Sequence, residues 1–255
     1  MYGVCAEEDN VMLLMELAEK GDLFHTFEAI RENTGNLSKH DKKSMDSWST
    51  RIRILLQTAK GMSYLCSQSP PVLHRDLKSL NILLDNDLNA KLSDFGLAKR
   101  KEKTKSILSS KATKGIASSK TGGEVVDSIR WMAPELYDIT SKDPYTKKSD
   151  VFSFAVVMWE MATFEVPYDA HSDNVIIGAA SQGKRLPLPD SNDSTLPAGF
   201  IALLQDCWTQ DPKETARLLG DRASSRNHRR SCEEGRSRKG IESRISRDED
   251  ESSWC

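Results

Sequence analysis

The chain has 255 residues, a formal net charge of −2 and five cysteines. A chain of this length can bury the core of one or two domains, and its small charge argues against nucleic-acid or anionic-membrane partners. The odd cysteine count, without any C-x-x-C pair, favours reduced thiols over a disulfide framework. The N-terminus lacks the pattern of a signal peptide, and no apolar run approaches the roughly 20 residues that span a bilayer. A cytoplasmic protein without a membrane span is therefore expected.

The first elements predicted along the chain are a strand and a helix. Residues 11–17, VMLLMEL, form a continuous apolar run that predicts one buried strand. Gly21 and Asp22 end this run, and Asp22 is a suitable N-cap for a helix that begins at Leu23. The polar stretch 31–47 is predicted to be a surface loop.

A long amphipathic helix and a tight hairpin are predicted next. Apolar residues recur at helical spacing in SWSTRIRILLQTAKGMSYL, at Ile52, Leu55, Leu56, Ala59, Met62 and Leu65. Gly61 lies within this helix and costs about 1 kcal/mol relative to alanine. Pro70 and Pro71 end the helix, and the apolar segments 82–84 and 90–92 flank a short polar turn. This pattern predicts a β-hairpin.

The second half of the chain is expected to be mainly helical. Residues 98–121 are basic and rich in hydroxyl groups, so they are predicted to form a mobile loop before a short helix at Pro134. Residues 149–164, SDVFSFAVVMWEMATF, are apolar on almost all sides, which predicts a helix at the centre of the domain. Two further helices are expected at about 174–182 and 198–208.

Five motifs follow one another in a fixed order: HRDLKSLN at 74–81, DFG at 94–96, WMAPE at 131–135, KSDVFSFAVVMWEMAT at 148–163 and CWTQDP at 207–212. Their order and spacing resemble the eukaryotic protein kinase domain. The resemblance is strongest to the tyrosine-kinase-like (Raf and mixed-lineage) group of serine/threonine kinases, and it covers residues 2 to about 212. It implies an α+β, protein-kinase-like fold with a mainly α-helical large lobe and a small-lobe remnant of one or two strands.

The resemblance also implies a division of the chain. Residues 1–18 would form the small-lobe remnant and hinge, 19–220 the C-terminal lobe with an activation segment at 94–135, and 221–255 a disordered polar tail. No G-x-G-x-x-G motif occurs in the sequence. The glycine-rich loop, the strand lysine and its helix glutamate are therefore not expected in this chain.

The resemblance assigns the chemistry to four residues. Phosphoryl transfer requires mainly positioning and charge neutralisation. Asp76 is expected to be the catalytic base, and Lys78 to offset the charge of the transferring phosphate. Asn81 and Asp94 supply oxygen atoms for Mg²⁺, which shares its ligand shell with phosphates. The expected cofactors are therefore ATP and Mg²⁺, and the expected reaction is phosphorylation of protein substrates in signal transduction.

By the same resemblance, Met15 is the gatekeeper at the back of the adenine pocket, Glu16 and Ala18 lie in the hinge, and Leu83 forms the floor under the adenine. Plain core packing is the alternative for these apolar side chains. Lys78 favours serine/threonine over tyrosine substrates, because tyrosine kinases usually carry arginine and alanines there.

Four residues are expected to be structural: His74, Phe95, Glu135 and Asp150. Asp150 would hold the backbone of the His-Arg-Asp loop in shape. Ser128 matches a hydroxyl residue that contacts the catalytic Asp and Lys in serine/threonine kinases.

Regulation is expected through Arg75, which in this family pairs with a phosphate on the activation segment. Ser118, Ser119 and Thr121 are the predicted phosphorylation sites, and an upstream activating kinase is a predicted partner. The alternative is a flexible polar loop without a switch. Unchanged activity after alanine substitution of all three hydroxyl residues would rule the switch out.

Two other functions remain open. The chain could be a catalytically impaired kinase-like fragment or pseudokinase that acts as a binding or scaffold module, because the glycine-rich loop is absent. The Arg/Ser-rich tail could bind RNA or protein, although its acidic residues nearly balance its basic ones. A phosphotransfer assay distinguishes the enzyme from the scaffold.

Overall fold

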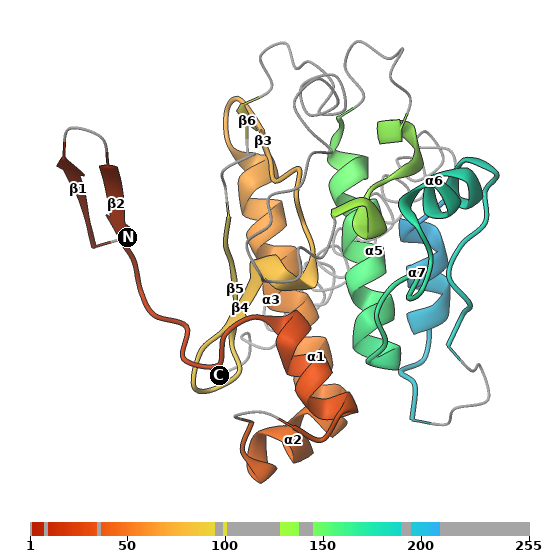
Figure 1. The fold of residues 1–255 in the computed structure, drawn as a ribbon, viewed down its shortest axis with the longest axis horizontal. Helices are drawn as coiled ribbons and strands as arrows, with labels where there is room; N and C mark the ends of the chain where they lie inside the picture. The colour runs from red at the N-terminus through yellow and green to blue at the C-terminus, as the bar shows by residue number, and fades with distance from the viewer. Residues whose placement is uncertain are drawn as a thin grey trace, which may run out of the picture. The chain divides into compact units, whose positions relative to one another are not determined.

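The structure is a computed structural model that describes residues 2–7, 10–34, 37–94, 99–100, 128–137, 145–189 and 195–209. All of these residues belong to the first of two compact units, Met1–Gln210. The elements, labelled as in Figure 1, are β1 (Gly3–Glu7), β2 (Asn10–Leu14), α1 (Leu23–Arg31), α2 (Lys39–Asp46), α3 (Trp48–Ser67), β3 (Val72–Leu73), η1 (Ser79–Asn81), β4 (Ile82–Leu84), β5 (Ala90–Leu92), β6 (Lys99–Arg100), η3 (Ser128–Trp131), η4 (Pro134–Tyr137), α5 (Lys147–Thr163), α6 (Asp173–Ser181) and α7 (Phe200–Cys207).

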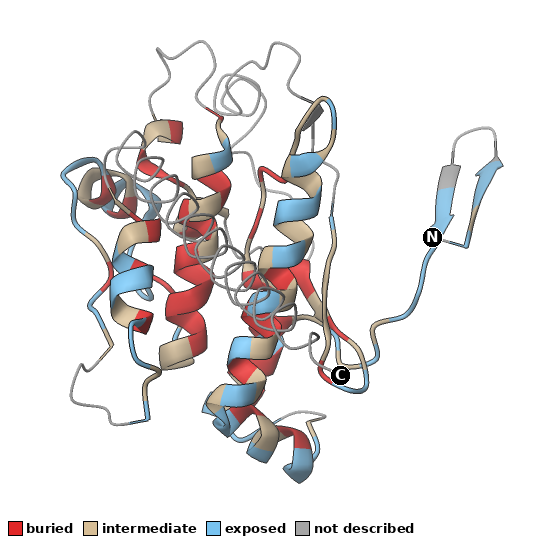
Figure 2. Ribbon diagram, turned by 180° about the vertical axis from the view of Figure 1, so that it is seen from behind, coloured by how far each residue is buried: buried red, intermediate tan, exposed pale blue. Residues whose placement is uncertain are grey.

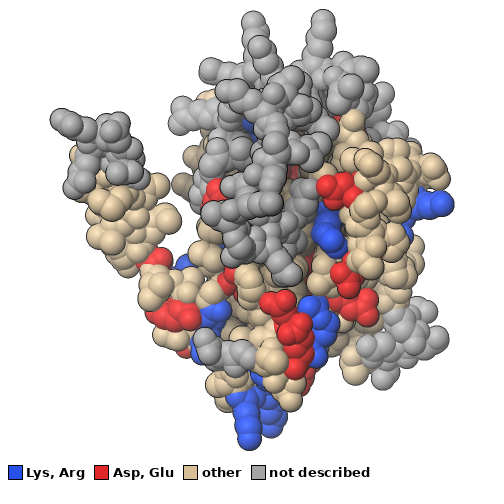
Figure 3. All heavy atoms as spheres, in the orientation of Figure 1, with Lys and Arg blue, Asp and Glu red and all other residues tan. Residues whose placement is uncertain are grey.

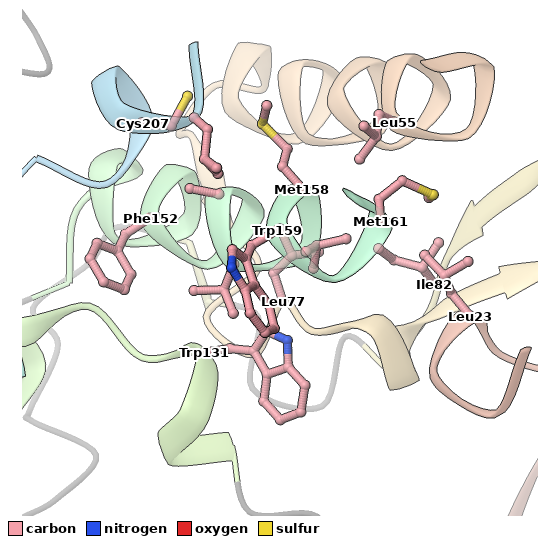
Figure 4. Close-up of a cluster of buried hydrophobic side chains, with 14 of the residues drawn as sticks. Leu23, Leu55, Leu77, Ile82, Trp131, Phe152, Met158, Trp159, Met161 and Cys207 are labelled. Atoms are coloured by element: carbon pink, nitrogen blue, oxygen red, sulfur yellow. The ribbon is translucent and has the colours of Figure 1, made fainter. Parts of the chain in front are cut away.

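Helix α5 lies at the centre of the described core, as its apolar sequence predicts. Thr146 and Ser149 form a capping box at its start, and Phe164 ends it in the left-handed conformation with φ of 57°. The helix contacts α3, α7 and η3, and buried residues run along most of its length (Figure 2). In the cluster of Figure 4, side chains of α5 meet those of the other elements, among them Leu23, Leu55, Leu77, Ile82, Trp131 and Cys207.

The predicted helix starts at Leu23 and near residue 48 are confirmed, and side-chain caps explain them. The carboxylate of Asp22 accepts a hydrogen bond from the His25 N–H at 2.9 Å, and Ser47 caps α3 by accepting from the Ser49 N–H. Each cap satisfies a backbone donor that the first helical turn leaves without a helical partner.

Helix α2 corrects the prediction of a surface loop over residues 31–47. Ser38 caps this helix, and the buried carboxylate of Asp41 accepts hydrogen bonds from Ser38 at 2.8 Å and from Lys20 at 2.7 Å. Met45 is its one large apolar residue and is fully buried. A single apolar contact gives no helical periodicity, so the cap was the available sequence signal. The lysines of α2 appear as the blue tip at the bottom of Figure 3.

Strand β2 corrects the prediction of a buried strand over residues 11–17. It ends at Leu14 and pairs antiparallel with β1, and the described residues hydrogen-bond no third strand to this pair. Leu13 and Leu14 are 56% and 64% exposed. An apolar run is buried only where other layers cover it, and the described residues leave both side chains open to solvent.

The predicted hairpin is confirmed as β4 and β5, which pair Ile82 with Leu92 and Leu84 with Ala90. The chain after the expected hinge joins this hairpin through backbone hydrogen bonds. The Leu84 N–H donates to the Gly21 carbonyl at 2.8 Å, and the Lys20 N–H donates to the Leu84 carbonyl at 3.1 Å.

The predicted loop over residues 98–121 is wrong at its start, where Lys99 and Arg100 form β6 against β3. Strand pairing uses backbone groups, so a basic, polar sequence does not prevent it. The remainder of that loop and the predicted tail at 221–255 lie outside the described residues. No helix in the part of the chain that the structure describes is long and apolar enough to cross a membrane.

Gly61 permits close packing of α3 on β5. A Cβ atom at this position would lie 2.8 Å from Leu92 Cδ1 and 3.3 Å from Leu92 Cγ. Gly61→Val is therefore expected to lower the free energy of unfolding by about 1–3 kcal/mol through overpacking. In the Leu92→Ala background the same change should cost less, because the obstructing atoms are gone. Urea unfolding of both single variants and the double variant measures this coupling, and strictly additive effects would contradict it.

Candidate active site

The loop that carries the His-Arg-Asp motif is held by a buried carboxylate of α5. Asp150 accepts hydrogen bonds from the backbone N–H groups of His74 and Arg75, each at 2.9 Å. Burial raises the pKa of Asp150, while these two hydrogen bonds act in the opposite direction by stabilising the carboxylate. Arg75 has a φ of 71°, a left-handed conformation that is strained for a residue with a side chain. The two bonds to Asp150 therefore stabilise a loop shape that the sequence alone does not favour.

Asp76 and Lys78 follow on this loop, and their side chains face each other. Lys78 Nζ lies 3.2 Å from Asp76 Oδ2, and the two side chains are only 14% and 11% exposed. Lys78 also donates a hydrogen bond to Ser128 Oγ at 2.8 Å, which links the loop to η3. A lysine held beside a largely buried carboxylate places a cationic group next to the expected base. The structure thus brings Ser128 to Lys78.

Asn81 connects the expected base to the expected metal ligand. Its side-chain Nδ2 donates to the Asp76 backbone carbonyl at 2.6 Å. Its backbone carbonyl accepts from the Ser93 N–H at 2.9 Å, and Asp94 comes next, exposed and with a φ of 56°. Since Nδ2 points to Asp76, the amide oxygen is the atom that Asn81 offers to a cation. An amide oxygen from Asn81 and a carboxylate from Asp94 are both ligand types that suit Mg²⁺ whose other ligands are phosphates and waters.

The four residues predicted to line the adenine pocket differ in their exposure and in their contacts. Met15 is 60% exposed, and the carboxylate of Glu16 forms an ion pair with Lys91 on β5. Ala18 and Leu83 are half-buried, and Leu83 pairs with Asp22 through an isolated β-bridge. The chain after Ala18 is thus tied to β4, which carries the expected floor residue.

The remaining predicted residues fall into two groups. His74 is buried, with its Nε2 3.1 Å from the Ser93 carbonyl, and Glu135 accepts a hydrogen bond from Ser149 Oγ at 2.9 Å. The buried Arg75 guanidinium lies 4.4 Å from the ring centre of Tyr145, a cation–π contact. Phe95, Ser118, Ser119 and Thr121 lie outside the described residues.

Sequence reasoning missed two residues that support this site. The Tyr145 hydroxyl donates to the Arg75 carbonyl at 3.3 Å, and burial raises the pKa of Tyr145. Nothing in the sequence around Tyr145 marked it. Glu160 is fully buried in α5 and accepts hydrogen bonds from Ser79 Oγ at 2.7 Å and Trp131 Nε1 at 2.8 Å. A carboxylate within the apolar C-terminal half of α5 was a signal for the second residue.

Burial raises the pKa of Glu160 from 4.5 to about 8, against the hydrogen bonds from Trp131 and Ser79, which lower it. In the unfolded chain this carboxyl loses its proton near its ordinary pKa, whereas the folded protein holds the proton until about pH 8. Between those values the folded state binds one more proton than the unfolded state. Glu160 therefore makes the protein less stable as the pH rises through this range.

Comparison with Glu160→Gln isolates this contribution, because glutamine does not titrate. The free energy of unfolding of the wild type relative to this variant is expected to fall by about 1.4 kcal/mol per pH unit between about pH 5 and pH 8. Urea unfolding at several pH values in that range measures the slope. A difference that stays constant with pH would show that Glu160 is ionised in the folded protein.

The mainly helical body around α5, with its few short strands, is consistent with a protein-kinase-like fold. A family model described as protein tyrosine and serine/threonine kinase matches residues 1–219. The chain belongs to the protein kinase family, which confirms the predicted resemblance and the predicted fold class.

Named relatives agree with this assignment. The chain is 37% identical over 228 residues to receptor-interacting serine/threonine-protein kinase 2 of Bos taurus, covering 86% of this chain and 38% of the relative. It is 36% identical over 212 residues to mitogen-activated protein kinase kinase kinase 12 of Rattus norvegicus, covering 83% and 20%. It is 34% identical over 212 residues to the probable serine/threonine-protein kinase drkC of Dictyostelium discoideum, covering 83% and 24%. The chain thus spans well under half the length of these relatives.

Proposed function

We propose that this chain provides the C-terminal lobe of a serine/threonine protein kinase that acts in signal transduction. The observation that supports this most directly is the position of Lys78, whose Nζ lies 3.2 Å from the Asp76 carboxylate and 2.8 Å from the Ser128 hydroxyl. This arrangement keeps a cation and a proton acceptor side by side on a loop that Asp150 holds. Residues 19–220 would form this lobe, and residues 1–18 the hinge and the last part of the small lobe.

In this proposal Asp76 accepts or orients the proton of a substrate serine or threonine hydroxyl. Lys78 offsets the negative charge that develops on the transferring group. Ser128 keeps the ammonium group of Lys78 next to Asp76. Asn81 and Asp94 would hold Mg²⁺, and the main chain at Glu16 and Ala18, with Met15 and Leu83, would contact the adenine. ATP, when bound with Mg²⁺, supplies the phosphoryl group.

The test is a phosphotransfer assay on the full-length protein that contains this chain. Purified protein, Mg²⁺ and labelled ATP are incubated with matched peptides that carry Ser, Thr or Tyr as the only hydroxyl residue. Incorporation into the Ser and Thr peptides, lost in the Asp94→Asn variant, is the expected result. Asp169→Asn provides a matched control, because Asp169 is exposed and lies beyond the end of α5.

Two outcomes would contradict the proposal. Preferred incorporation into the Tyr peptide would overturn the substrate class. No incorporation, together with no change in thermal stability on adding Mg²⁺ and ATP, would favour the kinase-like binding module instead.

A further inference from the structure

The loop that carries the expected base is connected to η3 at two points. The first is the hydrogen bond from Lys78 to Ser128, at the start of η3. The second runs through Glu160, which accepts from Ser79, the residue after Lys78, and from Trp131, the last residue of η3. These contacts close a ring that joins the loop, η3 and α5.

Each member of the second connection is removed from solvent. Ser79 and Glu160 are 0% exposed and Trp131 is 1% exposed. Figure 4 shows the indole of Trp131 among the buried side chains near Leu77 and Trp159. Breaking either hydrogen bond would leave a buried polar group without its partner, which is costly in a dry environment. The bridge is therefore expected to resist opening under conditions in which exposed contacts exchange readily.

Two links between η3 and the loop restrict the orientation of η3 more than a single link would. The Lys78–Ser128 bond links only the start of η3 to the loop, and Arg130 in the middle of η3 donates to the Pro167 carbonyl at 2.7 Å, outside the loop. The bond from Trp131 to Glu160 adds a link at the opposite end of η3, so both ends of η3 are tied to the loop or to the helix that holds it. Because α5 carries both Asp150 and Glu160, one helix holds the loop at His74–Arg75 and again at Ser79.

We infer that Glu160 is a positioning residue that fixes η3 to the loop bearing Asp76 and Lys78, so that the two segments keep one relative orientation. Its part in catalysis rests on the proposed function, but the coupling of the two segments does not. The positioning role requires only a side chain of the same shape that hydrogen-bonds both Ser79 and Trp131. Glutamine can make both hydrogen bonds, since its carbonyl oxygen accepts from Trp131 and its amide donates to the Ser79 hydroxyl.

The test is hydrogen exchange of backbone amides in the full-length protein. The Asn81 and Met132 amides report on the two segments, because they donate to the Lys78 and Ile129 carbonyls. Glu160→Met is expected to speed exchange at both amides about tenfold, the factor that corresponds to the loss of one net hydrogen bond. The Thr26 amide in α1 is expected to change far less, and Glu160→Gln is expected to leave both segments near the wild type.

Met158→Ala is the matched control, since Met158 is buried in the same helix and its loss removes apolar contacts only. The inference is overturned if Met158→Ala and Glu160→Met give the same exchange profile, or if Glu160→Met loosens only one segment. If Glu160→Met does not fold, Ser79→Ala takes its place. It removes one bond of the bridge and is expected to speed exchange at Met132, and no change there would overturn the inference.

The exchange measurements do not depend on enzymatic activity, so a failure of the proposed function leaves this test intact. If phosphotransfer is observed, Ser79→Ala is expected to lower kcat and to speed amide exchange. Glu160→Gln is expected to leave kcat and the exchange rates near those of the wild type. Loss of kcat in Glu160→Gln with unchanged exchange would assign Glu160 a chemical role and overturn the positioning role.

Discussion

Asp76→Asn is expected to lower the rate of phosphotransfer by about 10²–10⁴-fold, the range for loss of a positioned general base. Asparagine has the shape of aspartate but does not accept the hydroxyl proton. The loop is expected to persist, because Asn81 donates to the Asp76 backbone carbonyl, which the change leaves in place. Lys78 also keeps its bond to Ser128. Initial rates at saturating Mg²⁺ and ATP measure the loss.

Asp87→Asn is the matched control, because Asp87 is an exposed aspartate in the turn of the β4–β5 hairpin. Its rate is expected to equal that of the wild type. Stabilisation by Mg²⁺ and ATP is expected to persist in Asp76→Asn, since Asn81 and Asp94 are the proposed metal ligands. A variant at Asp76 with an unimpaired rate would remove this residue from the chemistry.

Asp150→Ala is expected to lower the free energy of unfolding by about 2–5 kcal/mol, because two buried N–H groups lose their acceptor. The groups are those of His74 and Arg75, each 2.9 Å from an oxygen of Asp150. The strained φ of 71° at Arg75 is no longer stabilised once its N–H is released. Exchange of the α5 amides under native conditions measures the change in stability.

Asp150→Asn tests the cause of this loss. Asparagine keeps one acceptor oxygen but turns a donor toward the second N–H, so its effect is expected to be intermediate. Glu165→Ala, an exposed position just after the C-terminal end of α5, is expected to change stability by no more than about 0.5 kcal/mol. Equal effects of Asp150→Ala and Glu165→Ala would show that the loop does not depend on Asp150.

Local signals in the sequence were sufficient for most of the helical fold. The cap at Asp22, the helical periodicity of residues 48–67 and the apolar sequence of α5 each correspond to an element with nearly the predicted bounds. Each signal was reliable because cap, periodicity and composition act over one or two helical turns. Helix α2 was missed because its single buried apolar residue, Met45, gives no period.

Burial was harder to predict than secondary structure. The apolar residues of β2 were expected to be covered, yet Leu13 and Leu14 are more than half exposed among the described residues. An apolar sequence indicates which residues are stabilised by burial, but the packing of other elements decides whether they are covered. The same holds for Met15, whose role in an adenine pocket stays a prediction.

Motif order and spacing were enough to identify the protein kinase family and the residues of the expected chemistry, because Asp76, Lys78 and Asn81 lie within one short motif. What holds these residues in place became visible only in the folded structure. Asp150 and Glu160 lie more than 70 residues from the loop they contact. No local pattern could show that one helix binds the loop at two sites, or that Glu160 joins Ser79 to Trp131. Such contacts depend on the packing of α5 against distant segments, and the spacing of residues in the sequence does not predict that packing.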